Sequence, residues 1–289
     1  MNINKNDLKI VIPNKGRLSI KTIELLQTIG LEFETQERSL MSQVKNLPIT
    51  ILYVRASNIP EYVQDGIADL GVTGLDLAKE QAANIVILKK LGYGNADLVV
   101  AVPEKSNIKK VSDLKNKNIV TSYPHLTKKY LQSKKIKSNV IEVDGAVEIT
   151  PFLGLADAIT DLTSTGTTLK TNKLIPLDTI LKSEAILITN NKSQQEKGSE
   201  IDSILTRLDA AITAQKKVYI MMNAPEEKLE EIKKITPGLS SPTIMKLAKE
   251  GMVAIHSVID KNGSWEVVEK LKKIGASGIL IMPINKMLM

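Results

Sequence analysis

Short apolar runs alternate with amphipathic segments through the first two thirds of the chain. Residues 8–13 (LKIVIP) are predicted to form a buried strand, and the turn after it leads into a helix from Ser19. The apolar residues of that helix recur at helical spacing and are predicted to share one face: Ile20, Ile23, Leu26 and Ile29. Further strands, with one short helix among them, are predicted at residues 49–54, 59–66, 68–74 and 85–91. This alternation is typical of parallel βαβ units.

A glycine-rich break at residues 92–94 precedes a second series of the same kind. Its strands and helices are predicted at residues 96–103, 117–124, 126–135, 139–145, 146–154 and 156–162. A strand over residues 183–189 follows, then a polar stretch and a helix over 201–215. A strand that returns after a complete second series suggests that the chain crosses back to the first. The pattern predicts a two-lobed α/β body with a cleft, in which lobe I comprises residues 1–93 and 184–212 and lobe II residues 94–183.

The last part of the chain, residues 213–289, has a different order of predicted strands and helices. Its predicted elements follow the order β-α-β-β-α-β, at residues 217–225, 226–235, 243–248, 252–260, 264–275 and 277–284. This is the ferredoxin-like arrangement. No cluster of polar loop residues suited to chemistry accompanies it, so we expect a regulatory or assembly role there.

The amino-acid composition limits the kinds of site that the chain can have. The chain has no cysteine and two histidines, which excludes disulfides, thiolate metal sites and cysteine nucleophiles and disfavours a histidine-based metal site. Its net charge of +7 fits a small anionic substrate or nucleic acid, and an aromatic content of 3% without a basic tail favours the small anion. Neither a signal-peptide pattern nor an apolar run of about 18 residues is found, so we expect a cytoplasmic protein.

Residues 154–169 (GLADAITDLTSTGTTL) hold the richest cluster of polar side chains. A predicted strand leads into a hydroxyl-rich turn formed by Thr163, Ser164, Thr165, Gly166, Thr167 and Thr168. Gly166 permits a positive φ, which lets consecutive amides converge on an anion, and a helix starting there adds its dipole. Four or five charge-assisted hydrogen bonds of roughly 1.5–3 kcal/mol each would hold a phosphate monoester. The alternative is an ordinary Ser/Thr turn with a capping aspartate.

Two aspartates precede this turn. Asp157 and Asp161 are four residues apart, so on a strand they share one face, with Asp161 nearer the turn. Carboxylates beside a phosphate repel it unless ribose hydroxyls or a magnesium ion lie between them. The cluster therefore favours a phosphorylated sugar.

A longer signature includes this cluster. The pattern E-x5-G-x-A-x2-I-x-D-L-x2-T-G-x-T-L is occupied by Glu148, Gly154, Ala156, Ile159, Asp161, Leu162, Thr165, Gly166, Thr168 and Leu169. It resembles that of the ATP phosphoribosyltransferase family, the first enzymes of histidine biosynthesis. The segments PNKGRLS, GIADLGVTG, TSYPHLTKKYL and KLKKIGASGILIMPINKM extend the resemblance along the whole chain. Its last part resembles the regulatory module of the family's long form.

The resemblance implies a reaction and a fold. N1 of the adenine of ATP displaces pyrophosphate from C1′ of phosphoribosyl pyrophosphate, with Mg²⁺, to give phosphoribosyl-ATP. The implied catalytic body has the two lobes of a periplasmic-binding-protein-like fold, followed by the ferredoxin-like βαββαβ regulatory domain. Because the nucleophile belongs to ATP, catalysis must come from positioning and electrostatics.

Site roles follow from the same resemblance. Residues 163–169 are implied to hold the 5′-phosphate, while Asp157 and Asp161 hold ribose hydroxyls and stabilise positive charge on the sugar. Glu148 is implied to orient a ribose hydroxyl or to take a proton from the adenine amino group, with helix capping as the alternative.

Basic residues are expected around the polyphosphates. Lys15, Gly16 and Arg17 lie in the turn after the first strand, where α/β sheets bind ligands, and Arg17 is also a catalytic candidate. Lys9 lies on that strand. Arg38 and Arg55 follow the family's pattern of arginines close to a dimer contact and would stabilise pyrophosphate in a neighbour's site or form structural ion pairs.

The remaining nucleotide contacts are implied for Leu18, Asp69, Gly71, Thr73, Gly74, Ser122 and Tyr123. Tyr123 would stack on a base or simply pack in the core, and Gly74 would border the nucleotide or serve only as a turn glycine. His125 is interpreted as a helix-cap or surface residue.

In the regulatory domain, the resemblance implies feedback inhibition by histidine bound between subunits of a homo-oligomer that assembles from dimers to hexamers. The implied contacts are Asn223, Leu239, Ser241, Thr243, Val258 and Gly278. Asn223 stands where some family members have Asp, which predicts weaker inhibition. The alternative for this domain is assembly alone. The alternative for the whole chain is a two-lobed small-molecule-binding or effector-sensing protein without catalysis.

Overall fold

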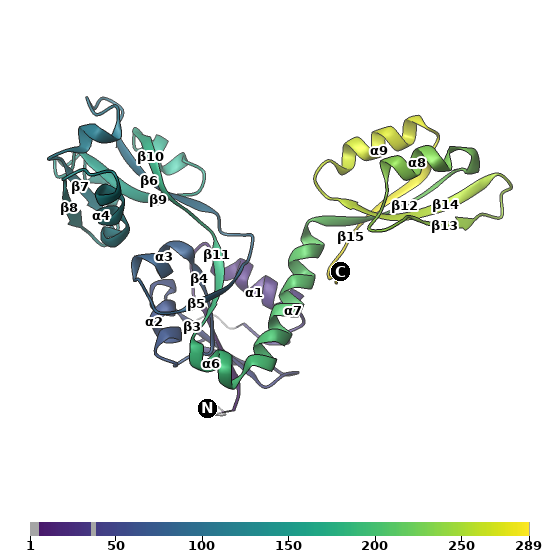
Figure 1. Ribbon diagram of the computed structural model, residues 1–289, viewed down its shortest axis with the longest axis horizontal. Helices are drawn as coiled ribbons and strands as arrows, with labels where there is room; N and C mark the ends of the chain where they lie inside the picture. Colours follow the sequence, from purple (N-terminus) through teal and green to yellow (C-terminus); the bar gives the residue numbers. More distant parts are fainter. Residues whose placement is uncertain (1–5, 36–38, 289) are drawn as a thin grey trace. The chain divides into compact units, whose positions relative to one another are not determined.

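The computed structural model describes residues 6–35 and 39–288. The chain divides into two compact units, residues 1–24 with 31–201 and residues 25–30 with 202–289 (Figure 1). Within the described ranges, no helix combines the length and apolar character needed to cross a membrane.

One sheet of the first unit forms lobe I. In spatial order its strands are β2 (Met41–Gln43), β3 (Ile49–Val54), β1 (Leu8–Pro13), β4 (Leu70–Gly74), β11 (Ala185–Thr189) and β5 (Val86–Lys90). β1 runs parallel to β3 and β4, as predicted, but β11 runs antiparallel to β4, with Ala185 opposite Gly74. The chain enters this sheet from lobe II beside the carboxyl end of β4, so β11 must run in the opposite direction. Since β11 is antiparallel to both β4 and β5, the four longer strands of the first series, β1, β3, β4 and β5, all run in the same direction, and β11 is the returning strand that interrupts them.

A second sheet of the same unit forms lobe II. Its strands, in spatial order, are β10 (Leu174–Ser183), β6 (Ala96–Pro103), β9 (Ala158–Thr163), β7 (Asn118–Thr121) and β8 (Asn139–Glu142). β7 is parallel to β8 and β9, whereas β6 is antiparallel to β9 and β10. The carboxyl ends of β7 and β9 therefore lie at the same edge of this sheet.

Helices bury the apolar faces of both sheets. α2 (Ile59–Gln64) and α3 (Leu75–Glu80) cover lobe I, and α4 (Pro124–Ser133) packs on lobe II. A Cβ on Gly71 of β4 would lie 2.7 Å from Val63 and 2.8 Å from Ile59. Gly71 is thus explained by the close packing of α2 on β4.

On the predicted face of the first helix, α1 (Ser19–Thr28), Leu26 and the following Ile29 are buried as expected, but Ile20 is not part of the buried surface. Ile20 is 69% exposed, whereas Thr22 is fully buried. The Thr22 hydroxyl donates to the Leu18 carbonyl at 2.7 Å and lies 2.7 Å from the Tyr93 hydroxyl. A hydrogen-bonded threonine can therefore take the buried position that periodicity assigned to Ile20.

A buried hydroxyl on β9 gives a stability prediction. Within the described residues, Thr160 Oγ1 is buried and has no hydrogen-bond partner. Thr160→Val keeps the branched shape and removes the uncompensated group, so we expect the free energy of unfolding to rise by about 1 kcal/mol. Thermal denaturation should show a Tm increase of about 2–4 °C.

The neighbouring Thr121 provides the matched control. Its Oγ1 donates to the Thr160 carbonyl at 2.8 Å and accepts the Tyr123 N–H at 2.9 Å, so Thr121→Val should lower Tm. A lower Tm for Thr160→Val would mean that its hydroxyl is satisfied, contrary to the contacts described above.

The second unit contains an antiparallel sheet with helices on one face (Figure 1). Its strands, in spatial order, are β13 (Thr243–Lys246), β14 (Met252–Asp260), β12 (Lys217–Pro225) and β15 (Ser277–Pro283). α8 (Leu229–Ile235) and α9 (Ser264–Lys273) bury the side of the sheet that carries Ile220, Met222 and Ile255. This order and chain path confirm the ferredoxin-like prediction.

The remaining helices are α5 (Thr167–Thr171), α6 (Asn191–Glu196) and α7 (Gly198–Gln215). α6 lies in the polar stretch before the predicted helix, and Asn190 caps it by accepting the Ser193 N–H at 2.8 Å. The two-lobed, periplasmic-binding-protein-like body and the ferredoxin-like module are both confirmed. The residue numbers given for the domain boundaries stay predictions.

Candidate active site

The hydroxyl-rich turn lies at the carboxyl end of β9. Gly166 adopts a left-handed φ of +73°, and α5 begins at the next residue. The Thr163 hydroxyl accepts the Gly166 N–H at 3.0 Å, and the hydroxyls of Thr165 and Thr167 are 2.9 Å apart. The positive φ predicted for Gly166 is thus present, and it turns the chain from strand to helix.

The turn is anchored on one side and exposed on the other. Leu169 is 3% exposed and belongs to a core cluster of lobe II. The side chains that project from the turn are exposed: Ser164, Thr165, Thr167 and Thr168. The turn, defined here as residues 163–169, therefore presents hydroxyls to solvent from a fixed base, an arrangement suited to holding an anion.

Asp161 lies on β9 two residues before the turn. Its Oδ1 accepts the Leu162 N–H at 2.7 Å. Burial raises the pKa of the Asp161 carboxyl above its ordinary value, and the negative charge of Glu148 raises it further. The Glu148 carboxylate thus lies close enough to Asp161, at the start of the turn, to act on the ionisation of Asp161.

Asp157 lies at the other end of β9. Its Oδ2 accepts the Asn118 N–H at 2.9 Å, and its Oδ1 is 3.4 Å from Lys117 Nζ. Four residues of strand span roughly 13 Å. The structure therefore brings Asp161 and Glu148 together but places Asp157 away from the turn, where its contacts fasten β9 to β7.

A buried carboxylate that the sequence interpretation missed connects the two lobes. Asp76, in the first turn of α3, is 1% exposed. Its Oδ2 accepts the Tyr123 hydroxyl of lobe II at 3.0 Å, and its Oδ1 lies 3.4 Å from Arg17 Nη2. The Ser183 hydroxyl also donates to Oδ1. One carboxylate thus fixes a guanidinium from the first turn of lobe I and a phenol from lobe II.

The surroundings of Tyr123 change the pKa of its hydroxyl. Burial raises the pKa of the Tyr123 hydroxyl strongly, and the charge of Asp76 and its hydrogen bond to Asp76 raise it further. The charge of Asp161 acts in the same direction. Tyr123 is therefore a neutral hydrogen-bond donor placed between the carboxylates of Asp76 and Asp161.

Two glycines permit these close approaches. A Cβ on Gly74 would lie 2.3 Å from Asp76 Oδ1, and a Cβ on Gly94 would lie 2.3 Å from Leu18 Cδ2. The Gly94 carbonyl also accepts a hydrogen bond from Arg17. A side chain at position 74 would thus clash with the Asp76 carboxylate in its observed conformation, which gives Gly74 a steric role in addition to its place in the turn.

Two family models match the chain. The model described as ATP phosphoribosyltransferase (HisG) matches residues 55–210, and that of the HisG C-terminal domain matches residues 214–286. The chain belongs to the ATP phosphoribosyltransferase family.

Similar proteins extend over the full length of the chain. The ATP phosphoribosyltransferase of Methanosarcina acetivorans is 44% identical over 288 residues, covering 97% of this chain and 99% of the relative. That of Bacteroides fragilis is 40% identical over 281 residues, with the same coverage. A solved structure, the ATP phosphoribosyl transferase (HisG:HisZ) complex from Thermotoga maritima, is 33% identical with a TM-score of 0.62. That match covers 70% of this chain and 96% of the other.

Two residues expected at the site of this ATP phosphoribosyltransferase family member lie at the amino ends of lobe I strands. Asp69 precedes β4, where its carboxylate contacts Lys197 Nζ at 2.7 Å and the Ser193 hydroxyl at 2.8 Å. It also accepts the Lys9 N–H at 2.8 Å. Lys9 itself lies near the amino end of β1. Ligands of α/β sheets bind at the carboxyl ends, so the structure brings neither residue to the Arg17–Asp76 contact.

Other expected residues lie at the carboxyl ends. Lys15 and Gly16 form the exposed turn after β1, and Arg55 is exposed just after β3. Thr73 is buried and donates to the Ala56 carbonyl at 3.2 Å. The Ser122 hydroxyl donates to the Val143 carbonyl at 2.8 Å. Arg38 lies outside the described residues.

Residues expected to bind histidine lie on or beside one face of the second unit's sheet. Thr243 of β13 is paired with His256, while Asn223 of β12 is paired with Ala254. Val258 lies two positions along β14, and a Cβ on Gly278 would be 3.5 Å from Asn223 Nδ2. Leu239 and Ser241 precede β13. This face is opposite the one that α8 and α9 bury.

His256 has a local partner on that face. Its Nδ1 lies 3.1 Å from the Tyr219 hydroxyl, and the two rings meet edge to face at 5.9 Å. These contacts give His256 a structural role in the sheet.

Proposed function

We propose that the chain transfers the phosphoribosyl group of phosphoribosyl pyrophosphate to N1 of the adenine of ATP, and that residues 163–169 hold the sugar's 5′-phosphate. The N1–C1′ bond forms while the bond from C1′ to the pyrophosphate oxygen breaks, and its electron pair leaves with pyrophosphate. The observation that carries the proposal is the anchored, hydroxyl-lined turn with Asp161 two residues before it.

The turn holds the phosphate through the four exposed hydroxyls and the backbone N–H groups around Gly166. Each charge-assisted hydrogen bond contributes roughly 1.5–3 kcal/mol, and the Leu169 anchor keeps the donors in place before the substrate arrives. Preorganised donors lose no free energy to ordering when the phosphate binds.

Asp161 and Glu148 act on the sugar. Leaving-group departure places positive charge on C1′ and the ring oxygen, and a carboxylate in a buried setting stabilises that charge more strongly than one in water. Burial raises the pKa of Asp161 most, and the charge of Glu148 raises it further; the repulsion between the two carboxylates is relieved when ribose hydroxyls or a cation come between them.

The same pair fits Mg²⁺. This ion prefers oxygen ligands and is commonly held by one or two carboxylates together with substrate phosphates. Over residues 6–35 and 39–288 no group of three or more His, Cys, Asp and Glu side chains could hold a metal ion, so the substrate would complete the coordination. When bound, Mg²⁺ would neutralise charge on the departing pyrophosphate.

Arg17 and Tyr123 serve the nucleotide and pyrophosphate. Arg17 is fixed by Asp76 and the Gly94 carbonyl, yet its side chain is 35% exposed, so it can still contact a phosphate. Lys15 adds a second, exposed cation in the same turn. The ring of Tyr123, fixed through its hydroxyl, would stack on adenine.

The function is tested by mixing the purified protein with ATP, phosphoribosyl pyrophosphate and Mg²⁺ and following the near-ultraviolet absorbance of phosphoribosyl-ATP. Absorbance should grow with ATP and not with GTP. Binding of both substrates without product would contradict the proposal. Because both substrates are intracellular metabolites, we place the reaction in the cytoplasm.

We also propose that the second unit binds histidine and joins copies of the chain, from dimers to hexamers, through the open sheet face. Support comes from apolar side chains exposed there, since Met245 is 50%, Leu280 55% and Met282 40% exposed. Asn223 and Thr243 offer polar groups on the same face.

Thr243→Ala should raise the histidine concentration that halves activity about tenfold, the effect of one lost hydrogen bond, and leave the uninhibited rate unchanged. Lys246→Ala, at the other end of β13, is the control and should be inhibited like the wild type. Inhibition curves at fixed substrate measure both. Activity that does not respond to histidine in the wild type would remove this assignment.

A further inference from the structure

A cavity of about 550 Å³ lies between the lobes, away from the phosphate turn. Both lobes belong to the same compact unit. α3, the segment after it and β5 line one side, and α4 and β10 line the other. Its lining includes no residue of the phosphate turn and none of Arg17, Asp76, Tyr123, Glu148 or Asp161. This is a separate space, of the size that small-molecule sites have.

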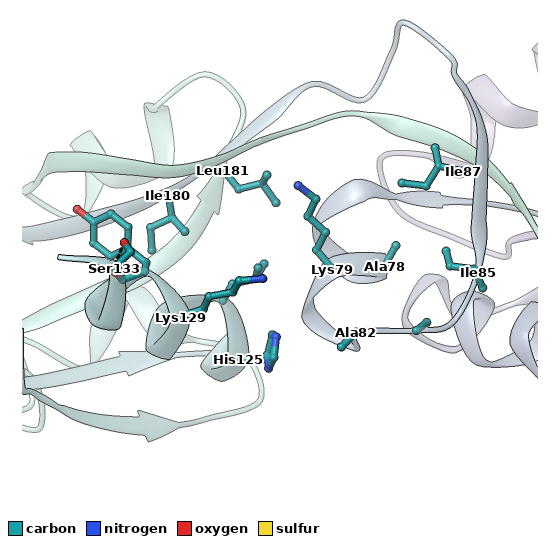
Figure 2. A pocket seen from close by; sticks show the side chains of 13 residues that line it. Ala78, Lys79, Ala82, Ile85, Ile87, His125, Lys129, Ser133, Ile180 and Leu181 are labelled. Atoms are coloured by element: carbon teal, nitrogen blue, oxygen red, sulfur yellow. Dashed lines mark hydrogen bonds between the residues drawn. The ribbon is translucent and has the colours of Figure 1, made fainter. Parts of the chain in front are cut away.

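Its walls combine apolar surface with cations. Apolar side chains come from both lobes, among them Ile85, Leu126 and Leu181. Lys79 extends from α3, and Lys129 and His125 extend from α4, toward the space between the two helices (Figure 2). No acidic residue is part of the lining.

The nearby carboxylates are already engaged elsewhere. Glu80 caps α4, because its two oxygens accept the His125 N–H at 2.7 Å and the Leu126 N–H at 2.9 Å. Asp178 accepts the Tyr130 hydroxyl at 2.5 Å and lies 3.4 Å from Lys134 Nζ. Across the described residues, neither the Lys79 nor the Lys129 ammonium is paired with an acidic group.

We propose that this cavity binds a small organic monoanion with an apolar body, such as an aromatic carboxylate or sulfonate. The anion pairs with the Lys79 and Lys129 ammonium groups of the lining, while the apolar body covers Ile85, Leu126 and Leu181. Because the cavity walls come from both lobes, a molecule that contacts both walls stabilises the arrangement of the two lobes seen in this structure.

The test uses 8-anilinonaphthalene-1-sulfonate, an aromatic sulfonate that becomes fluorescent on apolar surfaces. Titration of the wild type should show a saturable class of one site per chain. Lys129→Glu should weaken that class at least tenfold. Lys128→Glu makes the same charge change on the adjacent residue of α4, which does not line the cavity, and should leave it unchanged.

A second variant removes space without changing charge. Ala83→Trp fills the cavity from the lobe I side and should abolish the same class of sites. Circular dichroism confirms that each variant is folded. Equal affinity in the wild type, Lys129→Glu and Ala83→Trp, or no saturable binding in the wild type, would overturn the proposal.

Discussion

Asp161→Asn is expected to lower kcat about 100-fold or more without lowering the melting temperature. The amide keeps the size of the side chain but removes the charge that faces the developing positive charge on the sugar, and losses of this order are usual for such groups. Steady-state kinetics at saturating substrates and thermal denaturation measure the two effects. Thr121→Val is the comparison, since its lost hydrogen bonds affect stability first.

The stability half of this prediction follows from the direction of the pKa shift. The folded-state pKa of Asp161 lies above its ordinary value of 3.8, so folding favours the protonated form. That contribution is complete below the unfolded pKa and is lost as pH rises through the folded value. At neutral pH the ionised carboxylate therefore lowers stability, and Asn removes this effect.

Wild-type activity should show the same ionisation. As pH falls through the raised pKa of Asp161, kcat should decline, whereas the residual activity of Asp161→Asn should lack that step. A near-normal rate, or a Tm several degrees below the wild type, would make Asp161 a structural residue.

Asp76→Asn is expected to lower kcat/KM about 100-fold by releasing Arg17 and Tyr123 from their shared carboxylate. Displacements of about 1 Å in a positioned group cost rates of this order. The pKa of the Tyr123 hydroxyl should also fall, because in the wild type the charge of Asp76 and the hydrogen bond to Asp76 add to the effect of burial in raising it. Ultraviolet titration of tyrosinate, compared with Tyr123→Phe to assign the signal, measures that shift.

Ser183→Ala is the control that distinguishes the positioning of Arg17 and Tyr123 by Asp76 from the local packing of the Asp76 side chain. It removes the hydroxyl that donates to Asp76 but leaves the Arg17 and Tyr123 contacts. We expect a small change in kcat/KM and little change in the Tyr123 pKa. An unaltered Tyr123 pKa in Asp76→Asn would show that Asp76 does not set the state of this tyrosine.

The sequence predicted strands well where apolar runs are continuous and bounded by turns. β6 and β14 span the predicted residues, 96–103 and 252–260. β10 was not predicted, because Pro176 interrupts it and much of it is exposed. It is an edge strand with register shifts near that proline, and a proline is tolerated at a sheet edge. A local pattern does not reveal which strand becomes an edge.

In the candidate site, too, features set by neighbouring residues were predicted, and features set by distant contacts were not. The turn around Gly166 and the carboxylate of Asp161 depend on adjacent residues, and the sequence placed them correctly relative to each other. Asp157 and Asp69 match the spacing of site residues, but each is bound at the amino end of its strand by contacts with distant residues. Asp76 went unnoticed because its partners lie 47 to 107 residues away in the chain. Its one local signal is the glycine two positions before it.

The central claim is most directly tested by a crystal structure of the protein with phosphoribosyl pyrophosphate and Mg²⁺ bound. We expect the 5′-phosphate within hydrogen-bonding distance of the hydroxyls and N–H groups of residues 163–169, with ribose oxygens beside Asp161. A sugar phosphate bound elsewhere, with that turn contacting only solvent, would contradict it.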